Sequence, residues 1–154
     1  MTTYALDDID RHIIKFLAEN GRTSNREIAR RLDLTEGTIR TRIKRLEADE
    51  VVRVAAVVNV ARLPKAVIVF LRIEVAPHFL VSDVVKNVAE LPDTTIVASL
   101  IGRADVFAIT YVKDSADLAN YVHNTIDKIP GVLRVEYSVS YQIIKHDYRF
   151  TPGL

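Results

Sequence analysis

The chain has 154 residues, contains no cysteine, and 49% of its residues are hydrophobic. This length allows one ordinary domain or two small ones, and the composition supplies enough apolar side chains for at least one core. Without cysteine the chain can form no disulfide bond or thiolate metal site, which fits a reducing cytoplasm. The net charge of +1 indicates no overall attraction to a polyanion.

The basic residues are nevertheless concentrated in the first half. Residues 1–65 hold 13 Lys and Arg against 10 Asp and Glu, whereas residues 66–154 hold 8 against 10. The stretch from Arg22 to Arg45 has 8 basic and 3 acidic residues, which suggests one polyanion-binding face. No apolar run reaches the roughly 18 residues of a membrane span, and the acidic start "MTTYALDDID" is not a signal peptide. We therefore expect a cytoplasmic protein without membrane contact.

The first part of the chain predicts three helices joined by short turns. In "ALDDIDRHIIKFLAEN", apolar residues recur at helical spacing, and three aspartates lie near the start, where the helix dipole favours negative charge. Ser24 and Glu27 form the capping-box pattern of a second helix. Thr35 is the expected N-cap of a third helix, whose buried side includes Ile39 and Leu46. Two short helices at this spacing are typical of a helix-turn-helix.

The outward face of the third helix predicts DNA binding. On a helical wheel, Gly37, Lys44 and Arg45 lie opposite the apolar side, and Arg40 and Arg42 lie at its two edges. Small residues let a helix approach base edges in the major groove, while the helix start and the flanking arginines can hold phosphates. A basic helix by itself is usually a solvated face, but two capped helices around a tight turn favour DNA binding. The predicted DNA-binding residues are Arg22, Thr35, Glu36, Gly37, Thr38, Arg40, Thr41, Arg42, Lys44 and Arg45.

The valine-rich stretch that follows predicts one or two strands that form a small wing or a connector. Pro64 marks the best candidate boundary, because the charge balance changes there. We therefore predict a helix-turn-helix DNA-binding domain over residues 1–50, a wing or connector strand over 51–65, and a second domain over 66–154.

The second domain is predicted to be ferredoxin-like. Its expected elements are strands over 66–75, 94–102, 105–112 and 132–145, and helices over 80–91 and 115–129, with Ser82 and Ser115 as candidate N-caps. The order β-α-β-β-α-β is the ferredoxin-like pattern, so the fold class of the chain is α+β. Helices on one face of an antiparallel sheet leave the other face open. An open apolar face usually has a partner, which argues for a homodimer.

The segment "LDDIDRHIIKFLAENGRTSNREIARRLDLTEGTIRTRIKRLE" resembles the DNA-binding domain of the Lrp/AsnC (feast/famine) regulators. The matching features include the "LD" that opens the first helix, "GR" before the second, "LT" before the third, and Arg42 with Leu46-Glu47 within the third. The second half is similar to the family's effector domain, including "GRAD" at 102–105 and "IPGV" at 129–132. The resemblance implies a winged helix-turn-helix that binds double-stranded DNA. It also implies an effector domain that dimerises and assembles further, to a tetramer or octamer, and small ligands, commonly amino acids, bound at contacts between dimers.

Three positions depart from the family pattern. Asp49-Glu50 follows the third helix where glycine is usual, and Pro64 stands where a glycine is common near the end of the connector. These two changes bear on the shape of the connector. Tyr137 occupies a position of the last strand where threonine is frequent. Because that strand helps to line the family's effector site, a bulky phenol would shrink or reshape the site.

By the resemblance, the turn "IGRAD" forms part of the effector site. Gly102 allows a tight turn whose N–H groups can receive a carboxylate, Arg103 can pair with a carboxylate, and Asp105 can hold an ammonium group. The same G-x-x-D pattern is also that of an ordinary hairpin turn. The predicted effector-binding residues are Ile101, Gly102, Arg103, Ala104, Asp105, Tyr137 and Ser138.

No catalytic pattern accompanies these features. The sequence contains no H-E-x-x-H, G-x-S-x-G, P-loop or G-x-G-x-x-G motif. We therefore expect no enzyme, no metal and no cofactor other than a small-molecule effector. The alternative interpretation is an amino-acid-sensing or metabolic protein that acts through the ferredoxin-like half and uses the helical half for docking. Ligand binding without DNA affinity would favour that alternative.

Overall fold

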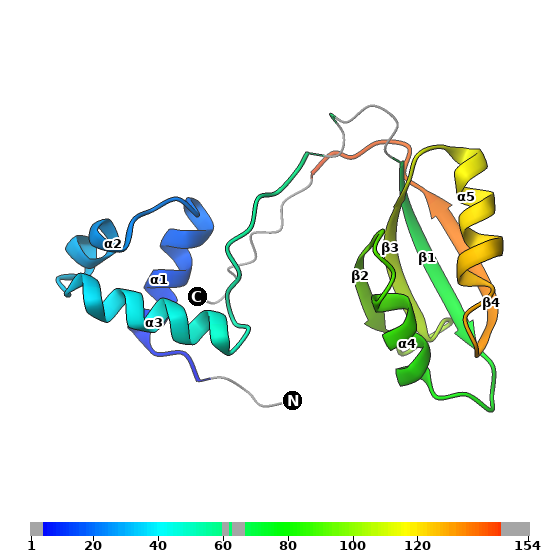
Figure 1. Ribbon diagram of the computed structural model, residues 1–154, viewed down its shortest axis with the longest axis horizontal. Coiled ribbons are helices and arrows are strands. Elements are labelled where there is room, and N and C mark those ends of the chain that lie inside the picture. Colours follow the sequence, from blue (N-terminus) through cyan, green and yellow to red (C-terminus); the bar gives the residue numbers. More distant parts are fainter. Residues whose placement is uncertain (1–4, 60–61, 63–66, 146–154) are drawn as a thin grey trace. The chain divides into compact units, whose positions relative to one another are not determined.

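The computed structural model describes residues 5–59, 62 and 67–145. These residues form two compact units, one within residues 5–58 and the other within residues 59–144. The first unit is helical, and the second contains a four-stranded sheet with helices (Figure 1). The predicted α+β class, with a helix-turn-helix followed by a ferredoxin-like domain, is confirmed.

The first unit consists of α1 (Asp8–Glu19), α2 (Asn25–Leu32) and α3 (Glu36–Ala48). Each helix contributes apolar residues at helical spacing to one core, which contains the buried side chains of Ile13, Ile28, Ala29, Ile39 and Leu46. Because the three helices share this core, α3 is fixed against both α1 and α2 and can present only its remaining face.

The predicted caps hold the ends of the two short helices. Ser24 Oγ accepts from the Glu27 backbone N–H at 3.2 Å, and Thr35 Oγ1 accepts from the Thr38 backbone N–H at 3.2 Å. Between the two helices, Asp33 adopts the left-handed conformation with φ of 54°. The turn is therefore tight enough to start α3 only a few residues after α2 ends, as a helix-turn-helix requires.

The strand predicted after α3 is absent from residues 51–59, and that prediction is wrong. The N–H groups of Val51 and Val52 both donate to the Leu46 carbonyl, at 2.9 and 3.2 Å. Glu50 has a φ of 57°, the left-handed conformation that glycine adopts most readily, so the backbone keeps this shape without glycine. A valine-rich segment becomes a strand only where a neighbouring backbone pairs with it. Residues 60–61 and 63–66, which include the boundary predicted at Pro64, lie outside the described residues.

The second unit has the β-α-β-β-α-β order. Its strands are β1 (Val67–Val75), β2 (Thr94–Ser99), β3 (Val106–Val112) and β4 (Val132–Val139). Its helices are α4 (Val81–Ala89) and α5 (Ser115–Tyr121), and α5 continues into the π-helical turn η2 (Val122–Ile126). The sheet is antiparallel, in the order β2-β3-β1-β4. Both helices lie on the same face of the sheet (Figure 1).

The two faces of this sheet differ in burial. Alternate residues of β1, such as Leu71 and Ile73, pack into a closed core with side chains of α4, α5 and η2. On the opposite face, the rings of Phe70 and Phe107 stack at 6.3 Å with an angle of 19° between their planes, and both are only partly buried. Ile96, opposite Ile109 on the same face, is 38% exposed. The predicted open apolar face is therefore present.

Two predicted caps of the second unit are wrong. α4 follows Leu80 without a side-chain cap, and Ser82 lies inside its first turn. Asp114, not Ser115, is the N-cap of α5, and its Oδ1 accepts from the Asp117 backbone N–H at 2.9 Å. Aspartate and serine are equally good N-caps. The backbone is extended at Asp114 and helical from Ser115, and this makes Asp114 the cap of α5.

Several predicted elements extend too far. The last helix ends at residue 126 rather than 129, β2 ends at 99 rather than 102, and β4 ends at 139 rather than 145. Beyond these ends only isolated backbone hydrogen bonds are described, such as Leu100 N–H to the Asp105 carbonyl and Ser140 N–H to the Ile68 carbonyl, both at 2.8 Å. Hydrogen bonding, and not hydrophobicity, sets the end of a strand.

Candidate nucleic-acid interface

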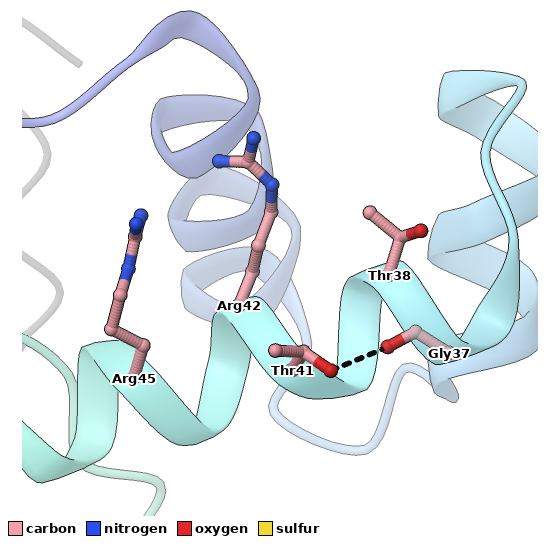
Figure 2. A pocket seen from close by; sticks show the side chains of 5 residues that line it. All are labelled: Gly37, Thr38, Thr41, Arg42 and Arg45. Carbon is pink, nitrogen blue, oxygen red and sulfur yellow. Dashed lines mark hydrogen bonds between the residues drawn. The ribbon is translucent and has the colours of Figure 1, made fainter.

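One side of α3 carries a hollow of about 480 Å³. It is lined by Gly37, Thr38, Thr41, Arg42 and Arg45, all of which are predicted DNA-binding residues. Figure 2 shows that Thr38, Arg42 and Arg45 point to the same side of the helix. Thr41 Oγ1 donates to the Gly37 carbonyl at 3.0 Å, so this hydroxyl is held against its own helix. The structure thus brings five of the ten predicted residues to one surface.

The other five predicted residues belong to the same helical unit but do not line the hollow. Thr35 and Glu36 are at the start of α3, Arg40 and Lys44 are exposed further along it, and Arg22 is exposed in the turn between α1 and α2. Within the part of the chain that the structure describes, Arg40 and Lys44 have no ion-pair partner. Their full positive charges are therefore available to a phosphate backbone.

Arg42 and Arg45 have partners that the helical wheel did not anticipate. Arg42 Nη1 donates to Asp7 Oδ2 at 2.6 Å and to Asp10 Oδ1 at 2.8 Å. Arg45 Nη2 donates to Asp10 Oδ2 at 2.8 Å. The Asp10 side chain is only 1% exposed, whereas that of Arg45 is 51% exposed. We call these four residues the Asp–Arg cluster; it joins the start of α1 to the middle of α3.

The sequence contained a signal for this cluster. The aspartates near the start of α1 were attributed to the helix dipole, and Asp7 does act as the N-cap, accepting from the Asp10 backbone N–H at 2.8 Å. Asp10, however, lies one turn before Ile13 and Ile14, on the apolar side of the helix. A carboxylate in an apolar stripe is rarely buried without a cationic partner, and that rule points to an arginine on a neighbouring element.

The contacts in the cluster shift the pKa values of Asp7 and Arg42. The backbone N–H of Asp10, and next the Arg42 guanidinium, hold the pKa of Asp7 below its ordinary value of 3.8. The Asp7 and Asp10 carboxylates raise the pKa of Arg42. Elsewhere in the unit, the Arg31 guanidinium lowers the pKa of Glu27 from its ordinary value of 4.5, through a hydrogen bond of 2.8 Å. Asp7, Glu27 and Arg42 are therefore charged near neutral pH.

The predicted effector turn has an exposed tip and an anchored base. Ile101, Gly102 and Arg103 are exposed, and Gly102 has a φ of 152°, a conformation that favours glycine. Ala104 is buried, and Asp105 Oδ2 accepts from the Val75 backbone N–H at 2.7 Å. One carboxylate oxygen of Asp105 thus holds the turn to β1, and Arg103 is the exposed cation of the turn.

The other two predicted effector residues lie on a different strand. Tyr137 and Ser138 are opposite Leu71 and Phe70 in the pairing of β4 with β1, at the edge of the sheet. Among the described residues no hydrogen bond links them to the 101–105 turn, which joins β2 and β3. Tyr137 is 50% exposed, so its phenol is not packed into the core. Within one chain, the predicted effector residues form two separate groups.

Within the described ranges, no group of three or more His, Cys, Asp or Glu side chains is placed to hold a metal ion. None of the described helices is both long enough and apolar enough to span a membrane.

Comparison with known proteins agrees with this geometry. Residues 6–53 match a family model described as a winged helix-turn-helix DNA-binding domain. Residues 61–152 match an AsnC-type model described as a C-terminal dimeric alpha+beta barrel domain. A chain of Pyrococcus horikoshii named as an HTH-type transcriptional regulator is 33% identical, over 93% of this chain and 90% of its own length.

Solved structures show the same fold. A transcriptional regulator from Neisseria meningitidis, in complex with L-Met, superposes with a TM-score of 0.80 at 24% identity and covers 97% of this chain and 98% of its own. AsnC from E. coli superposes with a TM-score of 0.74 at 22% identity and covers 93% and 97%. A three-helix unit with a presented α3, followed by a ferredoxin-like unit, defines a class of DNA-binding transcriptional regulators. The chain belongs to the Lrp/AsnC family of these regulators.

The lowered pKa of Asp7 predicts an acid-dependent contribution to stability. A carboxylate whose pKa is lower in the folded state stabilises the fold above its ordinary pKa, and this contribution is lost as the pH falls through the folded value. Asp7→Asn keeps a capping side chain but removes the charge. We expect the melting temperature of wild type to exceed that of Asp7→Asn near neutral pH, and the difference to shrink below about pH 4.

The control for this measurement is Asp8→Asn, which makes the same change of charge at a neighbouring carboxylate for which the structure describes no ion pair. A difference between wild type and Asp7→Asn that stays constant from neutral to acidic pH would contradict the role of the charge.

Proposed function

We propose that the protein is a sequence-specific DNA-binding regulator in which α3 enters the major groove. The observation that carries this proposal is the outward face of α3. It is narrow at Gly37 and Thr41 and carries the exposed cations Arg40 and Lys44. The helix itself is held by the Thr35 cap and the shared core. A rigid helix with small residues at its start can approach base edges, and cations beside it bind phosphates.

We also propose that two copies associate through the open face of the sheet. Supporting this is the apolar surface around the stacked Phe70 and Phe107, which a lone chain leaves partly exposed. The family model over this half is described as dimeric. A helix-turn-helix dimer binds two half-sites about one helical turn apart, so pairing would also place two copies of α3 on one DNA site.

Finally, we propose that a small effector, an amino acid, modulates this assembly. The N. meningitidis regulator of the same fold was solved with L-Met. In this chain the exposed Arg103 can pair with a carboxylate, and the Asp105 oxygen that does not bind Val75 can accept from an ammonium group. A ligand that favours one assembly would change the spacing of the DNA-binding units by population shift.

DNA binding is tested with Lys44→Ala and Arg40→Ala. The probe is the DNA fragment upstream of the protein's own coding sequence, titrated at several salt concentrations. Each substitution is expected to weaken binding several-fold and to make the plot of log K against log salt shallower by about one unit, because one phosphate contact is lost. Lys86→Ala removes an exposed lysine from α4, outside the helical unit, and is the matched control. Unchanged binding in both α3 variants would contradict the assignment of this face.

Association through the sheet is tested with Phe107→Lys. A charge buried between two sheets is costly, so this variant is expected to sediment as a monomer where wild type sediments as a dimer or larger species. Ser82→Lys adds the same charge on the exposed side of α4 and is expected to leave the assembly unchanged. A folded Phe107→Lys protein that retains the wild-type assembly would rule out this face.

The effector is tested by a thermal-shift screen with L-methionine and the other common amino acids. A ligand at about 100 times its Kd stabilises the folded state by about 2.7 kcal/mol, which raises the melting temperature by several degrees. Arg103→Ala is expected to abolish the shift, whereas Lys128→Ala, which removes an exposed lysine distant in sequence from the turn, should retain it. A ligand-induced shift in a protein that binds no duplex would instead favour an amino-acid-sensing function without DNA.

A further inference from the structure

The Asp–Arg cluster raises a question about DNA affinity. Its two arginines, Arg42 and Arg45, line the hollow of α3 and face the surface assigned to DNA. Arginines at such a place would normally bind phosphates regardless of sequence. Here Asp7 and Asp10 receive hydrogen bonds from them at 2.6 to 2.8 Å. The two negative and two positive charges of the cluster cancel.

Because the Asp10 side chain is buried, the ion pairs that neutralise the cluster are difficult to break. The Asp10 side chain is 1% exposed and takes one arginine on each of its two oxygens. A buried carboxylate cannot be left without its cations, so Arg42 and Arg45 are costly to withdraw from it. Salt screens exposed charge pairs but affects a buried one much less. A passing phosphate therefore competes poorly for these two guanidinium groups.

The other two basic residues in this part of α3 differ from Arg42 and Arg45. Arg40 and Lys44 do not line the hollow, are exposed, and have no described ion-pair partner. Of the other charged groups in the first turns of α1, Asp8 has no described ion pair and Arg11 is partly buried. The same helix thus carries two cations that are open to phosphates and two cations that the protein itself neutralises.

We propose that Asp10, supported by Asp7, is a specificity-determining positioning residue: it holds Arg42 and Arg45 in a neutral cluster that limits sequence-independent DNA binding. This inference rests on the proposed DNA-binding function. With the cluster intact, affinity depends on contacts that α3 makes through its shape and its remaining side chains. With Asp10 uncharged, the four residues of the cluster together carry a net positive charge, which attracts any duplex.

The test measures binding to two duplexes, a mixed-sequence duplex of about 30 bp, which spans almost three turns, and the fragment upstream of the coding sequence. The variants are Asp10→Asn, Asp7→Asn and the control Asp8→Asn, which gains the same charge without touching the cluster. Asp10→Asn is expected to bind the mixed duplex about five-fold more tightly near 0.1 M salt and to steepen the salt dependence by about 0.9. The ratio of specific to mixed-sequence affinity should fall. Asp8→Asn should resemble wild type.

The possible results separate the inference from the DNA-binding function on which it rests. Thermal unfolding identifies variants that do not fold. If Asp10→Asn does not fold, Asp7→Asn provides the test. Its binding to the mixed duplex should change in the same direction but by less, because the Asp7 side chain is 50% exposed. Equal salt slopes in the folded cluster variant and Asp8→Asn, or weaker mixed-sequence binding in the cluster variant, overturn the inference but leave the DNA-binding function standing. A wild-type protein that binds neither duplex at low salt overturns both.

Discussion

One buried carboxylate in the helical unit determines how two arginines of α3 are oriented. Asp10 lies on the apolar side of α1, and its two oxygens bind Arg42 and Arg45 of α3. Removing a carboxylate from water is costly unless cations compensate, so the position of α1 and the orientation of both arginines are coupled. The shared apolar core would hold three helices together in any case. The ion pairs add a directional constraint that hydrophobic packing, which has no direction, does not supply.

The ion pairs of Asp10 change the interpretation of the basic residues in the first half of the chain. The segment from Arg22 to Arg45 has 8 basic and 3 acidic residues. Two of these basic residues, Arg42 and Arg45, are neutralised within the fold by aspartates of the first helix. The surface that remains combines small residues at the start of α3 with Arg40 and Lys44 further along it. Affinity that rests on few open cations depends less on the phosphate backbone and more on the fit of the helix to base edges. A regulator that must distinguish one site among many benefits from that balance.

In the ferredoxin-like unit, the two faces of the sheet differ in burial. Its helices cover one face of the sheet and leave Phe70, Phe107 and their apolar neighbours on the other face. Within the sheet unit, no described element covers this face, and the proposed association with a second copy would complete its burial. The effector turn and the residues of β4 form separate groups within one chain.

The sequence by itself determined the helix-turn-helix, its caps at Ser24 and Thr35, and the order of the strands and helices, because these follow from periodicity and from local hydrogen bonds between neighbours in the chain. It failed at residues 51–59, where valine content predicted a strand but no pairing backbone is described, and at the ends of β2 and β4. Only the tertiary structure decided that Arg42 and Arg45 are held by Asp7 and Asp10, residues more than thirty positions away. Contacts across such separations depend on how the helices pack, and the charge on a helical wheel carries no information about the partner it meets.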